Sequence, residues 1–180
     1  MAASRCLRDM LKSATRAQHD ALDAHLSPLA VEGDYRIFME IQHAARAPAE
    51  SWLGGLSTEA VPPLQSPLIA MDLAELGAEP AAAMLPFHPQ DHREALGVIW
   101  ALAGSSLGNR AILQRRRKRG EAVADRFLSD PAMPQFWAEF RPRIEREFDA
   151  ETAGHAITGA RRMFITFLTS YQLMTSRLAA

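Results

Sequence analysis

Apolar residues recur at helical spacing from one end of this chain to the other. Between about Ser4 and His25, the residues Leu7, Leu11 and Leu22 fall on one side of a helix. No stretch alternates β-branched apolar and polar residues between turn signals, which is the pattern of a half-buried strand. The pattern therefore predicts an all-α fold, with a first helix that stops at the turn Ser27-Pro28.

The same spacing predicts the remaining helices. We expect them over Asp34 to Leu56, Pro67 to Leu76, Asp91 to Arg119, Glu121 to Leu128, Met133 to Phe148 and Ala153 to Leu178. Asp34 is a suitable N-cap, and Pro48 should kink the helix that Asp34 begins. The proline-rich segments Val61 to Pro67 and Glu79 to Pro89 are predicted to be connections. Gly120 follows a basic run and should end the long helix.

Composition limits the class of protein. A chain of 180 residues suits one domain, so residues 1–180 are interpreted as a single domain. The net charge is -1, which favours neither nucleic-acid binding nor an acidic tail. The single cysteine, Cys6, excludes an internal disulfide. We see no secretory signal and no run of the ~18 apolar residues that a bilayer span needs, so no membrane and a cytoplasmic location are expected.

The segment WALAGSSLGNRAIL places Gly104 and Gly108 inside an apolar helix. Glycine in a helix interior costs roughly 1 kcal/mol relative to alanine, so something should compensate for the pair. Residues four apart share a helix face, and these two would bare a strip of backbone. Either a second helix or a flat ligand could lie against that strip, and close helix packing is the commoner use of small residues at this spacing.

The first predicted helix carries a histidine next to its apolar stripe. His19 lies beside the side that faces the core, and Lys12 lies two turns earlier, about 10 Å along the axis and about 20° around it. A neutral imidazole and an ammonium so placed would suit a planar metal macrocycle with acidic groups at its edge. A packed, hydrogen-bonded histidine is the alternative.

Three segments, LRDMLKSATRAQHDALDAHLSPL, DYRIFMEIQHAARAPAE and LAGSSLGNRAIL, resemble the bacterial haem oxygenases, especially the short ones associated with bacteriophytochromes. The resemblance implies a single-domain helical bundle that holds haem between the first helix and a kinked distal helix. It implies that His19 is the proximal iron ligand and that Lys12 contacts a haem propionate. The segment FWAEFRPRIE implies a second propionate contact, best matched by Arg141 and next by Arg143.

In the resembling family the glycine-rich segment lies over the haem, which implies a catalytic role for Gly104, Ser105, Gly108 and Asn109. Two residues depart from the family pattern. Ala103 stands where many bacterial members have glutamate, and Asn109 stands where a second glycine is common. We expect these departures to affect turnover more than haem binding.

The resemblance also implies the chemistry. Haem would be both substrate and oxygen-activating cofactor, and the products would be biliverdin, carbon monoxide and iron, with electrons from a ferredoxin or reductase. The basic run consists of Arg115, Arg116, Arg117, Lys118 and Arg119. It is either a solvated helix end or a docking patch for an acidic electron donor. Two other functions stay open: a haem-binding sensor or carrier without turnover, and a helical protein-interaction module.

Overall fold

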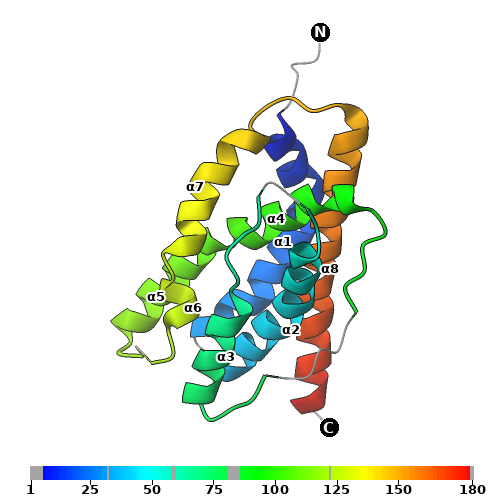
Figure 1. Cartoon of the computed structure of the whole chain (residues 1–180). Helices are drawn as coiled ribbons and strands as arrows, with labels where there is room; N and C mark the ends of the chain where they lie inside the picture. The colour runs from blue at the N-terminus through cyan, green and yellow to red at the C-terminus, as the bar shows by residue number, and fades with distance from the viewer. Residues whose placement is uncertain (1–5, 32, 58–59, 81–85, 122, 179–180) are drawn as a thin grey trace.

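The computed structural model describes residues 6–31, 33–57, 60–80, 86–121 and 123–178 (Figure 1). Within these ranges all regular structure is helical, which confirms the predicted all-α class. In chain order the elements are α1 (Leu7–Val31), α2 (Tyr35–Gly54), α3 (Ser66–Glu75), the 3-10 turn η1 (His92–Glu94), α4 (Ala95–Gly104), α5 (Ser106–Lys118), α6 (Arg126–Ser129), α7 (Ala132–Ile144) and α8 (Ala150–Leu178).

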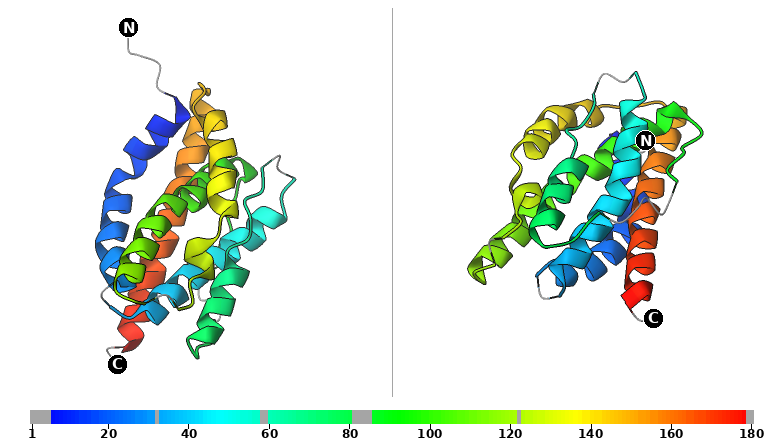
Figure 2. Two further views of the ribbon diagram at one scale, coloured as in Figure 1. Left: turned by 90° about the vertical axis from the view of Figure 1, so that its left-hand side faces the viewer. Right: turned by 60° about the horizontal axis from the view of Figure 1, so that its bottom comes forward.

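The long helix α8 is the centre of the bundle. It packs against α1, α2 and α4, while α3 packs on α2, and α6 packs on α3 and α5. Figure 2 shows α1 along one side of the molecule, with α5 and α8 beside it. The buried apolar side chains form two clusters, one around α4, α7 and α8 and the other around α2, α3 and α6. The site described below lies between α1, the α4–α5 junction and α8.

Helices α4 and α8 touch through their backbones at two glycines. A Cβ atom on Gly97 would lie 1.7 Å from the carbonyl oxygen of Ala156, and one on Gly159 would lie 2.0 Å from that of Glu94. Neither position has room for any side chain, because the atoms in the way belong to a helix backbone. These two glycines therefore set the distance between α4 and α8.

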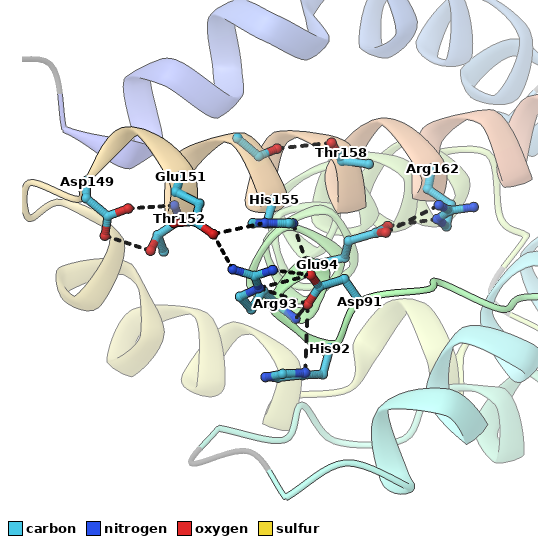
Figure 3. A network of polar contacts seen from close by, with 11 residues as sticks. Asp91, His92, Arg93, Glu94, Asp149, Glu151, Thr152, His155, Thr158 and Arg162 are labelled. Carbon is cyan, nitrogen blue, oxygen red and sulfur yellow. Dashed lines mark hydrogen bonds and ion pairs between the residues drawn. The ribbon is translucent and has the colours of Figure 1, made fainter.

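Polar side chains fasten the start of α4 to α8 (Figure 3). The Asp91 carboxylate accepts hydrogen bonds from the backbone and side chain of Arg93, and it lies 3.5 Å from Nδ1 of His155. The hydrogen bonds from Arg93 hold the pKa of Asp91 well below its usual range. At Glu94, three residues after Asp91, the carboxylate accepts a hydrogen bond of 2.8 Å from Arg162 of α8. The network keeps the backbone of η1 in register with α8.

The first helix is longer than predicted. Pro28 lies inside α1, which continues to Val31, so the predicted stop at Ser27-Pro28 is wrong. Ala30 and Val31 are buried in the second apolar cluster, and their burial outweighs the hydrogen bond that the proline lacks. The predicted start at Ser4 lies outside the described residues.

The predicted helix over Glu121 to Leu128 is also wrong, because only Arg126–Ser129 is helical there. Ala124 has a φ of 53°, in the left-handed region, which interrupts a helix. Asp34 is confirmed as the N-cap of α2, since its side chain accepts from the backbone nitrogens of Arg36 and Ile37. The predicted long helix from Asp91 divides into η1, α4 and α5, with Ser105 at the junction of α4 and α5.

One stretch of the described residues, His92–Lys118, is long and apolar enough to cross a membrane by length and composition, although none was expected. Its apolar side chains Val98, Ile99 and Leu102 are at most 2% exposed and belong to the core. Core helices of globular proteins share this composition, so the stretch is weak support for a membrane span.

Candidate functional site

A cavity of about 720 Å³ lies between α1, the α4–α5 junction and α8. This volume is within the range of small-molecule and cofactor sites. Aromatic rings form much of its apolar wall: Trp100, Trp137, Phe164 and Phe167. One long side of the cavity is the face of α1 that carries His19.

His19 lines the cavity, and its side chain is 54% exposed. Its ring packs edge-to-face with Phe164, with the centroids 5.8 Å apart. Its Nδ1 atom lies 3.3 Å from a carboxylate oxygen of Asp23, one turn along α1. A carboxylate at this nitrogen favours the tautomer protonated at Nδ1, which leaves the Nε2 lone pair available to a metal ion. The arrangement is typical of a histidine that ligates a metal.

Lys12 also lines the cavity, together with three further basic residues, Arg8, Arg16 and Arg115. The sequence had not indicated Arg8 or Arg16, although both follow the four-residue spacing of Lys12 on α1. The carboxylates of Asp20 and Asp23 line the cavity as well, so the four cations leave it with an excess of positive charge. Such a cavity suits a flat apolar ligand with acidic groups on its rim.

Arg141 and Arg143 of α7 are not among the residues that line the cavity. Arg141 Nε lies 3.3 Å from Glu145 Oε1, and the same oxygen accepts a hydrogen bond from Arg8 at 3.2 Å. The structure therefore places Arg141 one carboxylate away from the cavity edge and does not bring Arg143 to it.

No backbone atom of another helix lies within 4 Å of the Cβ positions of Gly104 and Gly108. A Cβ atom on Gly104 would meet only the Trp137 ring, at 3.9 Å, and one on Gly108 would meet nothing within 4 Å. The alternative that a helix packs on this strip is wrong. Ser105 and Asn109 line the cavity beside the glycines. Ala103 is fully buried and is not among the lining residues.

The α4–α5 junction is held by a buried arginine that the sequence analysis missed. Arg46 of α2 is 1% exposed, and its Nη2 donates a hydrogen bond of 2.6 Å to Ser105 Oγ. Its Nε donates to Gln42 Oε1 at 3.0 Å. Burial lowers the pKa of Arg46 to about 10, so the group is cationic at neutral pH. The polar residues Gln42, Arg46 and Glu50 recur every fourth position along the apolar face of α2, and this spacing was a signal in the sequence.

One residue of the basic run at the end of α5, Arg116, differs from both interpretations that the sequence allowed. Arg116 is 6% exposed, its guanidinium carbon lies 3.5 Å from the ring centroid of Tyr35, and it donates to the carbonyl oxygen of Ala30. It is therefore neither solvated nor available for docking. The cause is helical periodicity, since Arg116 follows the buried Leu113 by three residues. Arg117 pairs with Asp125 at 3.0 Å, and this pairing reduces the free charge of the run.

The donor set fits haem better than a bare metal ion. In the described ranges no group of three or more His, Cys, Asp or Glu residues could hold an ion. A single imidazole would be enough for an iron whose remaining protein-independent ligands come from a macrocycle. The aromatic walls and the cationic side chains would match the ring and its carboxylates.

Comparisons with known proteins bear on the fold and the family of the chain. No family model matches the chain. A protein named heme oxygenase from Xanthomonas campestris pv. campestris (strain 8004) is 32% identical over 108 residues, which is 57% of this chain and 64% of the length of that protein. The crystal structure of the NO- and CO-bound heme oxygenase from Neisseria meningitidis has a TM-score of 0.75 at 20% identity, covering 94% of this chain and 92% of that one.

The structural match shows that the chain has the all-α fold of heme oxygenase. Together the two matches support the resemblance to the bacterial haem oxygenase family. The chain spans less than two thirds of the length of its Xanthomonas relative. Neither match bears on an association with bacteriophytochromes, which stays a prediction.

Proposed function

We propose that residues 1–180 form a single haem oxygenase domain, which opens the haem ring to give biliverdin, carbon monoxide and iron. One observation carries this proposal: His19 and Lys12 of α1 line the same cavity as Gly108, and no atom lies within 4 Å of the Cβ position of Gly108. When bound, haem would supply both the oxygen-binding iron and the ring that is oxidised.

In this proposal His19 holds the iron through Nε2. The carboxylate of Asp23, 3.3 Å from Nδ1, would orient the imidazole as a ligand. Phe164 limits rotation of the ring by its edge-to-face contact. The histidine is thereby positioned before the ligand arrives.

Gly104 and Gly108 would let the backbone of α4 and α5 lie close to the ligand. A side chain at either position would occupy the cavity, because nothing else is packed there. The polar side chains of Ser105 and Asn109 lie on the same wall and could hydrogen-bond water in the cavity. This wall would contribute shape and ordered water in place of an acid–base pair.

Lys12 would bind a propionate by a charge-assisted hydrogen bond. Arg141, with Arg143 as second choice, is retained in the proposal as the other propionate contact. The shared carboxylate of Glu145 connects Arg141 to Arg8 at the cavity edge.

Electrons would come from an external ferredoxin or reductase in the cytoplasm, as the family resemblance implies. Arg116 is buried and takes no part in docking such a donor. The basic residues that remain exposed at this end of α5 are Arg115, Arg117, Lys118 and Arg119.

The experiment is an incubation of the purified protein with haem, oxygen, a ferredoxin with its reductase, and catalase to remove free peroxide. We expect biliverdin absorbance and one equivalent of carbon monoxide. His19→Ala should remove histidine ligation and turnover, and added imidazole should restore both in part. His25→Ala is the matched control, since His25 lies on the same helix and stacks on Tyr171 at 4.5 Å.

Asn109 favours one second candidate, a haem carrier or sensor without turnover. Its side chain lines the cavity where the family often has glycine, and it could crowd the ligand. Haem bound through His19 with no biliverdin formed would support this candidate. A protein that bound no haem at all would leave the interaction-module hypothesis.

A further inference from the structure

Arg46 is a buried cation that connects two walls of the cavity, α2 and the α4–α5 junction, without lining the cavity itself. Its Nε donates to Gln42 of α2, and its Nη2 donates to Ser105 at the α4–α5 junction. Its guanidinium carbon lies 5.1 Å from the ring centroid of Phe127 and 5.6 Å from that of Phe167. Gln42, Ser105 and Phe167 all line the cavity, whereas Arg46 does not.

The hydrogen bond from Arg46 determines which end of the Gln42 amide faces the cavity. Arginine has only donors, so the atom that it contacts must be the amide oxygen of Gln42. With Oε1 held by Arg46, the Nε2 group is the part of the amide that remains for other partners. Gln42 is 6% exposed and borders the cavity. We therefore expect its Nε2 group to donate to a molecule bound in the cavity.

The same guanidinium restrains Ser105. The hydroxyl of Ser105 donates to the carbonyl oxygen of Leu102 at 2.7 Å, so its lone pairs are left to accept from Arg46. Each partner of Arg46 thus has one orientation. A rotation of either side chain would break a hydrogen bond to a buried charge.

Stability alone does not account for Arg46. Its Nη1 atom is buried and has no hydrogen-bond partner among the described residues. A buried charge that is incompletely hydrogen-bonded costs more than an apolar side chain of similar volume at the same place. The neighbouring Phe127 and Phe167 rings would accept such an apolar side chain readily.

We propose that Arg46 is a positioning residue that turns the Gln42 amide N–H into the cavity and fixes the α4–α5 junction at Ser105. This inference rests on the proposed function, because the N–H donor acts on whatever diatomic ligand the haem iron binds in the cavity. A donor held in one orientation stabilises negative charge that develops on that ligand, at no cost of reorganisation.

The first test uses the protein without haem. In 15N-labelled protein we expect a slowly exchanging Arg46 Nε–H signal and Gln42 amide protons with shifts distinct from those of a free glutamine. In Arg46→Met the Gln42 shifts should move toward the free values. Arg116→Met is the matched control, since Arg116 is also a buried arginine but contacts Tyr35, Ala30 and Glu121. Unchanged Gln42 shifts in Arg46→Met would overturn the proposal.

The second test uses reduced haem with carbon monoxide and the infrared C–O stretch. A nearby N–H donor lowers this frequency, because it favours electron density on the ligand oxygen. Arg46→Met should raise and broaden the band, whereas Arg116→Met should leave it unchanged. Gln42→Glu should also raise the band, since a glutamate keeps the partner of Arg46 but removes the donor. An unmoved band in both Arg46→Met and Gln42→Glu would overturn the proposal.

The two tests separate this inference from the proposed function. If the unmodified protein binds no haem, the proposed function fails, and the shifts of Gln42 still decide whether Arg46 orients it. If Arg46→Met does not fold, Arg46→Lys replaces it. Lysine keeps the charge but lacks the planar fork that reaches both partners at once, so the same changes in the Gln42 shifts and in the C–O band are expected.

Discussion

Two pairs of glycines in this molecule serve opposite purposes. Gly97 and Gly159 lie where α4 and α8 touch, and a Cβ atom at either would lie within 2.0 Å of a backbone oxygen. Gly104 and Gly108 border the cavity, and a Cβ atom on Gly108 would meet nothing within 4 Å. The first pair is required by the fold, whereas the second costs helix stability and contributes no packing.

The difference shows that glycine spacing does not identify the partner. By helical periodicity Gly97 and Gly104, seven residues apart, would lie within about 20° of each other around the axis. In the structure the first faces α8 and the second faces Trp137 of α7. Only the packing of distant segments decides which glycine meets a helix and which meets a cavity.

The largest effect is expected for the packed pair. Gly97→Ala and Gly159→Ala should each lower the free energy of unfolding by about 3 kcal/mol, because α4 and α8 must separate to admit the methyl group. Gly154→Ala, on the same helix as Gly159 but with no atom within 4 Å of its Cβ position, should raise stability by up to ~1 kcal/mol. Urea unfolding measures all three. A cost below about 0.5 kcal/mol at both packed glycines would contradict the close contact.

The next effect concerns haem affinity. Gly108→Leu should fill the cavity and weaken haem binding by about 5- to 150-fold, corresponding to about 1–3 kcal/mol of steric cost. The same change should leave the apo protein no less stable, since it removes a glycine from a helix. Haem titration and urea unfolding on the same preparation measure both quantities. A large loss of apo stability would instead mean that Gly108 faces protein.

A smaller effect is expected for Gly104. Gly104→Ala places a methyl group 3.9 Å from the Trp137 ring, which is ordinary van der Waals contact. We expect a gain of up to ~1 kcal/mol in the free energy of unfolding. Thermal unfolding of the apo protein measures it. Destabilisation would show that the position is crowded and that the two glycine pairs differ less than the structure indicates.

The smallest effect is a pH dependence of stability that comes from Asp91, near the contact of Gly159 with Glu94. Asp91 has a lowered pKa because Arg93 donates hydrogen bonds to it, so the unfolded chain binds its proton more readily than the folded one. The resulting stability is present above the ordinary value of 3.8 and is lost as the pH falls below it. Asp91→Asn should therefore flatten the acid side of the stability curve slightly, because the site is exposed and screened. An equally steep curve in the variant would assign the acid sensitivity to other carboxylates.

Local rules predicted most of the helices and some of the residues that line the cavity. Asp34 was recognisable as an N-cap, and His19 and Lys12 were recognisable from their positions beside the apolar stripe of α1. The end of α1 was predicted wrongly, because burial of Ala30 and Val31 depends on distant elements that a local rule at Pro28 does not include.

The remaining part of the candidate site depends on contacts between segments far apart in the sequence. Arg46 is buried because Ser105, Phe127 and Phe167 surround it, and no single segment of the chain contains that information. Arg116 is different, since its spacing from Leu113 already placed it on the buried side of α5. Because four other basic residues flank Arg116, the sequence analysis interpreted the run as a whole and missed this spacing.

The central claim is that the space between His19 and Gly108 is built for haem, and a crystal structure of the protein with haem tests it most directly. We predict the iron on Nε2 of His19, the ring against the backbone of Gly104 and Gly108, and α4 and α8 still in contact at Gly97. Iron held by another residue, or a ring outside the cavity, would contradict the account.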